Sequence, residues 1–201
     1  MKYLLGEKLG MTQTYDEQGK VVPVTVIKAM PVTITQIRTI EKDGYSAVQV
    51  GTGERNKINK PLAGHLKEAG KFKKLKEFRN GAEVDSVVGN KFDVSVFSIG
   101  DKVKISGLTK GRGFQGAVKR YGFHGMPASH GHHHVLRHVG SIGQRFPQHT
   151  LKGMRMAGRM GGERVSVRGL KVISVDQANN LLAVRGAVPG RKGTWLEIIA
   201  L

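Results

Sequence analysis

The densest group of chemically capable side chains is a run of histidines in SHGHHHVLRHVGSIGQRFPQHTLKGMRMAGRM, residues 129–160. Neutral imidazoles bind zinc and nickel, and a histidine can also act as a general base. The same stretch contains arginines and lysines but no carboxylate. Three hypotheses therefore compete: a metal site, a catalytic histidine cluster, and a basic arm that lies inside an anionic partner.

The metal and catalytic hypotheses lack the residues that usually accompany them. The chain has no cysteine, which excludes thiolate zinc sites, a cysteine nucleophile and a disulfide scaffold. Zinc ligands and catalytic histidines also rely on neighbouring carboxylates, and the first one after the histidines is Glu163. We therefore expect adventitious nickel binding, but no functional metal, no cofactor and no enzymatic activity.

A second motif, GRGFQG at residues 111–116, has the G-x-G-x-x-G spacing of dinucleotide-binding loops. That motif requires a strand before it, a helix after it and an acidic residue about 20 positions downstream. The sequence offers none of these around residue 111. The spacing is therefore a weak signal and does not predict a nucleotide cofactor.

The charge of the chain favours the third hypothesis. Its 201 residues include 33 Lys or Arg and 15 Asp or Glu, a formal net charge of +18. Residues 1–107 have a net charge of +6 and residues 108–201 one of +12. Such an excess indicates a polyanionic partner, and the second half of the chain is where that partner should bind.

The elements that must position these residues are mainly strands. Residues 1–50 are rich in Val, Ile and Thr and have turn signals at residues 16–19 and 42–44, which predicts antiparallel β structure. Residues 59–80 predict a short helix followed by an edge strand, and residues 87–107 return to β character. Three further strands are expected within residues 163–199, with turns at residues 176–180 and 188–193.

This pattern predicts a β-barrel interrupted by a long insertion. We expect a split barrel domain formed by residues 1–110 and 161–201, with a small α+β insertion at about residues 55–100. Residues 111–160 are expected to form a long, basic, glycine-rich loop without secondary structure of its own. Loops of that length are usually functional or disordered, and its charge indicates that a partner orders it.

Folded RNA is the partner that this loop fits best. Lys and Arg contact phosphates, glycines allow close approach of the backbone, and Phe114, Tyr121, Phe123 and Phe146 offer faces for unpaired bases. Proteins that read DNA sequence present a recognition helix or a zinc module. A stretch this rich in glycine is not expected to form either of them, so DNA is not expected as the partner. The candidate RNA-binding residues are Lys110, Arg112, Phe114, Gln115, Lys119, Arg120, Phe123, His124, Ser129, His130, His132, Arg137, Ser141, Gln144, Arg145, Lys152, Arg155, Arg159, Arg164 and Arg168.

Several separated blocks resemble the ribosomal protein L3 family of the large subunit. They are LGEKLGMTQTYDEQGKVVPVTVI (5–27), GLTKGRGFQGAVKRYGF (107–123), ASHG (128–131), GSIGQR (140–145), KGMRMAGRMGGERVSV (152–167) and NLLAVRGAVPG (180–190). The blocks cover nearly the whole chain and occur in the order of the family.

The resemblance implies a six-stranded barrel of the translation-protein type with an α+β insertion. It also implies a loop that reaches through large-subunit (23S-type) rRNA toward the peptidyl transferase centre, an early role in subunit assembly, and ribosomal proteins L14 and L19 as neighbours. An RNA-binding or RNA-chaperone protein outside the ribosome is the alternative. A cytoplasmic location in the ribosome is expected, since no apolar run approaches the ~20 residues of a membrane span and Gly6, Glu7 and Lys8 interrupt any signal-peptide pattern.

Overall fold

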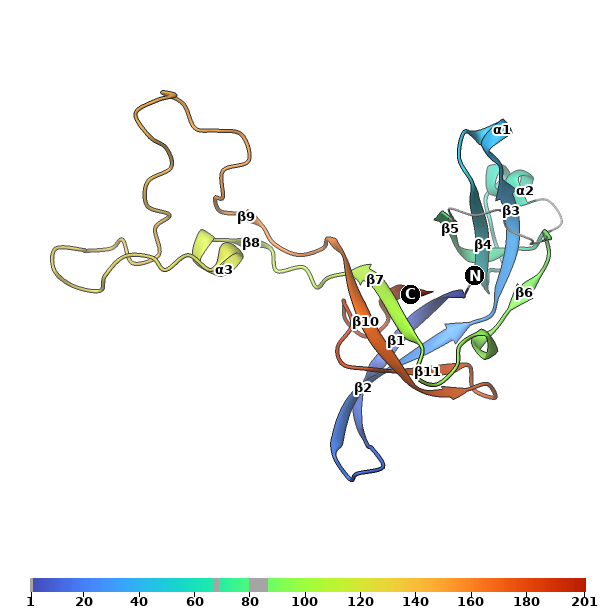
Figure 1. Ribbon diagram of the computed structural model, residues 1–201. Helices are drawn as coiled ribbons and strands as arrows, with labels where there is room; N and C mark the ends of the chain where they lie inside the picture. Colours follow the sequence, from blue (N-terminus) through green and yellow to red (C-terminus); the bar gives the residue numbers. More distant parts are fainter. Residues whose placement is uncertain (1, 67–68, 80–86) are drawn as a thin grey trace. The chain divides into compact units, whose positions relative to one another are not determined.

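The computed structural model of the chain describes residues 2–66, 69–79 and 87–201. It divides into two compact units, Met1–Leu108 with Arg164–Leu201, and Thr109–Glu163. We call the first the globular unit and the second the basic segment. The fold is mainly β, as the sequence predicts (Figure 1). Part of the expected α+β insertion, residues 67–68 and 80–86, lies outside the described residues.

Six strands of the globular unit form a closed antiparallel barrel. In spatial order they are β1 (Tyr3–Tyr15), β12 (Trp195–Ala200), β7 (Lys102–Leu108), β10 (Arg164–Asp176), β11 (Leu181–Arg185) and β2 (Val21–Met30). The barrel therefore combines strands from both ends of the sequence. Strands β7 and β10 are neighbours in it, with Leu108 opposite Arg164, and the basic segment is the connection between them.

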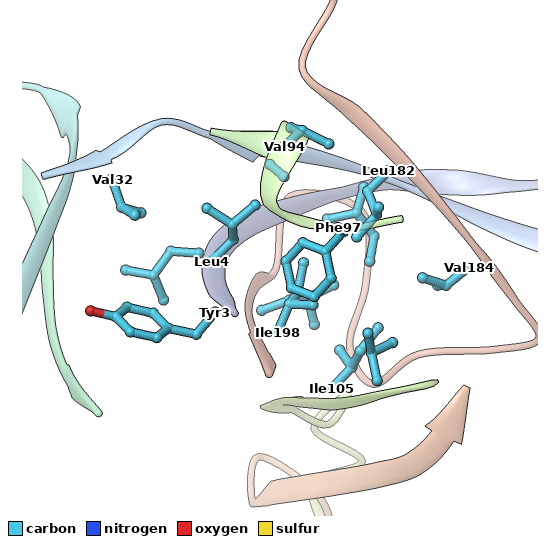
Figure 2. Packing of buried hydrophobic residues seen from close by; sticks show 14 of the residues in the cluster. Tyr3, Leu4, Val32, Val94, Phe97, Ile105, Leu182, Val184 and Ile198 are labelled. Atoms are coloured by element: carbon cyan, nitrogen blue, oxygen red, sulfur yellow. The ribbon is translucent and has the colours of Figure 1, made fainter. Parts of the chain in front are cut away.

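The barrel closes because its inward positions carry branched aliphatic side chains. Leu4, Ile198 and Ile105 lie opposite one another on β1, β12 and β7, and all three are fully buried. Leu182 and Ile27 form a similar buried pair on β11 and β2. Such cross-strand rows are what alternating strands bury when a sheet closes on itself. Figure 2 shows Leu4, Ile105, Leu182 and Ile198 meeting in one cluster.

A second, four-stranded sheet belongs to the same unit. Its spatial order is β5 (Phe72–Arg79), β4 (Ala47–Glu54), β3 (Val32–Arg38) and β6 (Lys91–Phe92), with helices α1 (Ile40–Asp43) and α2 (Lys60–Leu66) in its connections. The ring of Tyr3 from the barrel stacks on Phe78 of this sheet at 4.1 Å between centroids. The two sheets therefore share one core. The predicted helix and edge strand are confirmed as α2 and β5.

The stretch 87–107 is only partly the β structure that its composition predicts. Only β6 and β7 form there, and a 3-10 helix, Val94–Val96, lies between them. The Asp93 side chain accepts a hydrogen bond from the Ser95 amide at 2.9 Å, which caps that helix. Val94 and Phe97 are buried in the core. In a short stretch of sequence, apolar residues that are buried from a capped turn have the same pattern as those of a buried strand. The composition alone therefore predicts a strand here.

Candidate nucleic-acid interface

The basic segment begins and ends as a pair of hydrogen-bonded backbones. The Thr109 amide donates to the Glu163 carbonyl at 2.9 Å, and the Arg112 amide donates to the Met160 carbonyl at 2.8 Å. Two short strands continue this pairing, β8 (Phe114–Gln115) and β9 (Gly158–Arg159). The expectation of a segment without secondary structure is therefore wrong here. These contacts join residues more than forty positions apart, so no local pattern in the sequence signals them.

A one-turn helix, α3 (Ala117–Tyr121), follows β8 and is held by an arginine. The helix starts after Gly116 and ends at Gly122, which has the left-handed conformation of a helix C-cap (φ 74°). The Arg120 guanidinium donates a hydrogen bond to the Met156 carbonyl at 2.8 Å. Gly158 leaves room for it, because a Cβ atom there would lie 2.6 Å from Nη1 of Arg120. Arg120 therefore connects the two sides of the segment.

Aromatic rings and guanidinium groups alternate on this part of the segment. The Arg120 and Arg155 guanidinium carbons lie 4.9 Å and 5.9 Å from the centroid of the Tyr121 ring, and Phe123 lies 6.2 Å from the same ring. Phe114 is 77% exposed and pairs with Arg159 across β8 and β9. An exposed ring beside a cation suits a base that stacks while its phosphate is neutralised.

The loop between α3 and β9 depends on backbone contacts. The Met126 amide donates to the Leu136 carbonyl at 3.0 Å. Gly125 precedes it with φ 79°, and a Cβ atom there would lie 2.1 Å from the Leu136 oxygen. Only glycine fits such a close approach. His130 and His134 also have positive φ values, 59° and 57°, so these two histidines lie at turns in the chain.

The structure places eighteen of the twenty candidate residues on the basic segment, and Arg164 and Arg168 on β10 of the globular unit. Sixteen are exposed, and Gln115, Arg120, Phe123 and His132 are half-buried. Four use their polar atoms within the protein. Arg120 is bound as above, Gln115 donates to the Arg112 carbonyl, Ser141 donates to the Gly143 carbonyl, and Arg164 pairs with Glu197.

The basic segment has almost no core of its own. Within Thr109–Glu163, where the structure describes every residue, Ala117 alone is buried. The same range contains nine Lys or Arg and one carboxylate, a net charge of +8. Apolar burial is the main stabilising term of a folded chain, and like charges oppose compaction. The segment therefore has little apolar burial of its own to offset the repulsion between its charges.

Comparison with known proteins identifies the family. The Ribosomal protein L3 family model matches residues 68–187. The large ribosomal subunit protein uL3 of Acidothermus cellulolyticus is 50% identical over 198 residues, which is 96% of this chain and 89% of that protein. The uL3 protein of Chloroherpeton thalassium is 45% identical over 205 residues, 99% of both chains. This chain belongs to the ribosomal protein L3 family.

The match to the ribosomal protein L3 family includes the whole basic segment, since residues 109–163 lie inside the matched range. A third relative, uL3 of Thermosipho melanesiensis, is 49% identical over 196 residues, 96% of this chain and 95% of the relative. The resemblance noted in the separated sequence blocks is thereby confirmed. In the described part of the chain, no helix is long and apolar enough to cross a membrane.

The histidines of this ribosomal protein L3 family member do not gather into a ligand set. Among the described residues, which include all eight histidines, no three His or carboxylate side chains come together as a metal ion would need. The close spacing of His130, His132, His133 and His134 in sequence is therefore not a cluster in space. The turns at His130 and His134 are consistent with this separation.

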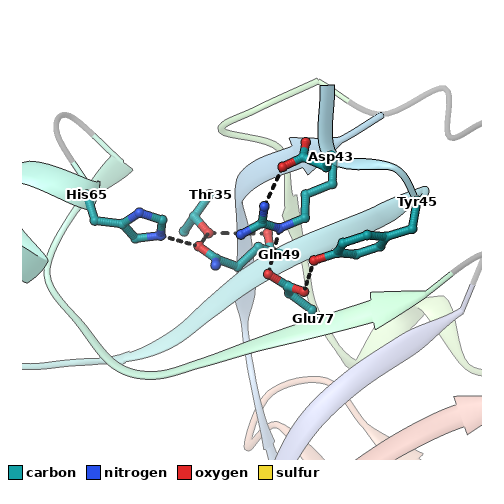
Figure 3. Close-up of polar contacts among 7 residues, drawn as sticks. Thr35, Asp43, Tyr45, Gln49, His65 and Glu77 are labelled. Atoms are coloured by element: carbon teal, nitrogen blue, oxygen red, sulfur yellow. Dashed lines mark hydrogen bonds and ion pairs between the residues drawn. The ribbon is translucent and has the colours of Figure 1, made fainter. Parts of the chain in front are cut away.

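One constellation of titratable groups in the globular unit does look like an active site (Figure 3). Arg38 Nε donates to Glu77 at 2.8 Å, and the Tyr45 hydroxyl donates to the other oxygen of that carboxylate at 3.0 Å. His65 faces the amide oxygen of Gln49 at 3.0 Å, not the carboxylate. A general base needs a free lone pair and a nucleophile to activate, and here the carboxylate is already bonded to two donors.

The pKa directions fit a structural role for this network. Burial alone would raise the pKa of the Glu77 carboxyl, but hydrogen bonds from Arg38 and Tyr45 outweigh it and lower the pKa below its ordinary value. Burial and the hydrogen bond to Glu77 raise the pKa of Tyr45. The carboxylate therefore stays ionised and the phenol stays protonated. The network ties β3 to β5.

We expect Glu77→Gln to destabilise the globular unit at neutral pH and to lose this effect in acid. A lowered pKa in the folded state means that the contribution is complete above the ordinary carboxyl pKa of 4.5 and disappears as pH falls through the folded value. Urea unfolding of both proteins between about pH 7 and pH 3 measures the difference. Glu41→Gln, at an exposed carboxylate of α1, is the matched control. A difference that does not change with pH would contradict the assignment.

Sequence reasoning did not find a hollow on the globular unit. It has a volume of about 310 Å³ and is lined by apolar residues that include Trp195 and Leu108, and by Lys74, Lys76, Arg164 and Glu197. Glu197 pairs with both Lys76 and Arg164. The ammonium group of Lys73 lies 5.8 Å from the centroid of the Trp195 ring. These residues come from β5, β7, β10 and β12. Because they meet only in the folded barrel, no spacing in the sequence predicts them.

Proposed function

We propose that this chain is a structural constituent of the large ribosomal subunit, located in the cytoplasm, and that its basic segment binds large-subunit rRNA. The observation that carries the proposal is the combination of a net charge of +8 with a single buried residue in Thr109–Glu163. The relatives of the chain are named as large ribosomal subunit proteins over nearly its full length. Folded rRNA is a polyanion with crevices. It would neutralise the positive charge of this segment and enclose a chain that has almost no core of its own.

RNA suits the segment better than DNA because of the size and type of its elements. The major groove of DNA is read by a helix of several turns or by a β-ribbon, whereas α3 has five residues and β8 and β9 have two each. RNA offers unpaired bases that stack on aromatic rings. The ring of Phe114, which is 77% exposed, provides such a platform.

The candidate residues divide into two roles under this proposal. Residues that are exposed and whose side chains make no hydrogen bond or ion pair within the described protein, such as Arg112, Arg137 and Lys152, contact phosphates. Arg120 instead keeps the segment folded, through its bond to the Met156 carbonyl, and Arg164 keeps Glu197 neutralised in the barrel. Replacing a residue of the second kind would therefore change the fold as well as the affinity for RNA.

The position of the segment in the chain supports a role in assembly. Its two ends join neighbouring antiparallel strands, β7 and β10, so the globular unit can form around the connection before RNA orders it. We propose that the globular unit docks early on large-subunit rRNA beside ribosomal proteins L14 and L19. The loop then reaches toward the peptidyl transferase centre. We propose no catalytic role for either part, since the Glu77 carboxylate of the network found among the described residues is already bonded to two donors.

The proposal is tested by following the tagged chain in cells. We expect it to sediment with large subunits after a high-salt wash, with one copy per subunit. A photoreactive amino acid in place of Phe114 should then crosslink to large-subunit rRNA. A chain that stays at the top of the gradient and crosslinks to messenger or small RNAs would overturn the proposal in favour of an RNA chaperone outside the ribosome.

A further inference from the structure

The hairpin of β1 and β2 continues beyond the barrel as a free two-stranded ribbon. Strand β1 pairs with β12 only through Glu7, and β2 pairs with β11 only from Val24 onward. The remaining residues of the two strands pair with each other as far as Tyr15 and Val21. Figure 1 shows this hairpin extending past the other strands of the barrel. We call residues 9–23 the ribbon.

One face of the ribbon is apolar and open to solvent. Tyr15 lies opposite Val21, Gln13 opposite Pro23, and Met11 opposite Thr25, so these side chains share a face. Met11, Tyr15 and Val21 are 52%, 68% and 54% exposed. At the barrel end of the same face Thr25 is fully buried, so the face is covered there and becomes exposed where the ribbon leaves the barrel.

The opposite face of the ribbon is partly covered by the protein itself. Val22, which points the other way, is buried, as is Val24 beside it in the barrel, whereas Thr12 is exposed. The Pro23 carbonyl accepts a hydrogen bond from the Gly186 amide at 2.8 Å, so β2 is also tied to the connection after β11. The barrel end of the ribbon is therefore tied to the globular unit.

The charge of the ribbon favours a protein over RNA as its partner. Residues 9–23 contain Asp16, Glu17 and Lys20 and no arginine, a net charge of −1 in a protein of +18. Both carboxylates are exposed at the tip. Phosphates would be repelled by them, and an RNA surface offers little to bury Met11, Tyr15 and Val21. A protein that presents lysines or arginines next to apolar side chains complements both features.

We propose that the ribbon is a docking surface for a basic ribosomal protein, which covers Met11, Tyr15 and Val21 and pairs its cations with Asp16 and Glu17. This inference rests on the proposed place of the chain in the large subunit. It goes beyond that place by assigning protein contact to the ribbon and RNA contact to the basic segment. Tyrosine is among the residue types enriched at the few positions that dominate the affinity of an interface.

The test uses a photoreactive amino acid in place of Gln13, which is exposed on the apolar face of the ribbon. Large subunits that contain this protein are purified, irradiated and analysed for crosslinked protein and RNA. We expect a crosslink to a peptide of another ribosomal protein that is rich in Lys or Arg. A crosslink to rRNA, to a second copy of this chain, or to nothing would overturn the inference.

Two variants, each carrying the same probe at position 13, test the apolar and the charged contacts separately. Tyr15→Ser should lower the crosslink yield by about tenfold, as expected for truncating a central anchor. Glu17→Lys should also lower it, whereas Glu41→Lys, the same charge change on α1, should not. Equal effects of Glu17→Lys and Glu41→Lys would contradict charge pairing at the ribbon.

The amount of chain in salt-washed subunits separates the two proposals. If the full-length chain is absent from large subunits, the proposed function fails. If the chain is present and Phe114 crosslinks to rRNA while position 13 also crosslinks to rRNA, only the ribbon assignment fails. Thermal unfolding of the free variants shows whether the globular unit is intact in each case.

Discussion

Raising the salt concentration from about 50 to 200 mM should lower the affinity of this chain for large-subunit rRNA by roughly 10³-fold or more. The reason is counterion release. Each phosphate neutralised by Lys or Arg frees condensed cations, so the logarithm of the affinity falls with the logarithm of salt in proportion to the number of contacts. The basic segment has nine Lys or Arg, and about six contacts give the stated loss.

A variant of the basic segment shows where this dependence arises. Replacing Lys110, Arg112, Arg137 and Lys152 by Gln removes four exposed cations that make no side-chain hydrogen bond or ion pair within the described protein. With about two contacts left, the same change in salt should lower the affinity only about tenfold. Filter binding or fluorescence anisotropy at several salt concentrations measures both slopes.

A matched control removes the same charge from the globular unit. Lys20, Lys42, Lys57 and Lys91 are exposed there, and replacing them by Gln should leave the salt slope close to that of the unchanged protein. If the two variants reduce the slope equally, the affinity comes from the net charge of the chain and not from the basic segment. An affinity that does not change with salt would remove phosphate contact as the basis of binding.

Deleting residues 127–150 and joining the ends with a short glycine linker should leave the globular unit folded. The deletion lies entirely within the basic segment, and it retains the pairing of β8 with β9 and the bond of Arg120 to Met156. A shorter loop also lowers the entropic cost of closure. The melting temperature of the globular unit should therefore be unchanged.

The same deletion should impair the subunits that contain the shortened protein. We expect incorporation, because Lys119, Arg155 and Arg159 remain near the start and end of the segment. Maturation should be slow and peptide-bond formation about tenfold slower or worse, since small displacements of reacting groups have effects of that size. Sucrose gradients and a peptidyl transfer assay measure the two effects.

A control for the deletion keeps the length of the loop and changes its charge. Arg137→Gln with Arg145→Gln neutralises two exposed cations of the deleted region and should reduce activity much less than the deletion. Unfolding of the shortened protein would mean that residues 127–150 belong to the core. Full activity of subunits that contain it would mean that the histidine-rich stretch is not the functional tip.

The barrel strands were predictable because their composition and their environment agree. Val, Ile and Thr are frequent in β2, and turn residues at 16–19 and 176–180 separate barrel strands that pair as neighbours. The closure of the barrel was harder to predict from the sequence. Strand β1 pairs with β12, which lies near the other end of the chain, and no local sequence pattern indicates such a long-range pairing. The helix α3 was missed because the glycines around it masked five consecutive helix-compatible residues, Ala117–Tyr121.

The location of the basic segment was predictable, but the roles of individual cations were not. Charge and glycine content alone delimit the segment, and sixteen of the twenty candidate residues are exposed. A sequence cannot distinguish an arginine that contacts phosphate from one that holds a carbonyl. Arg120 and Arg112 look alike in the sequence, yet only Arg120 is bonded through its side chain to the Met156 carbonyl. Trp195 and Lys73 likewise meet only through the fold.

The place of β12 in the barrel determines the order of events while the chain is being synthesised. Because β12 lies between β1 and β7, Leu4 and Ile105 lack the neighbour that covers them until residue 200 has left the exit tunnel. The basic segment, made earlier, therefore emerges from the tunnel while the barrel is still open. The nascent chain therefore exposes apolar strands and a cationic loop at the same time. Other factors have to prevent the strands from aggregating and the loop from binding the wrong RNA.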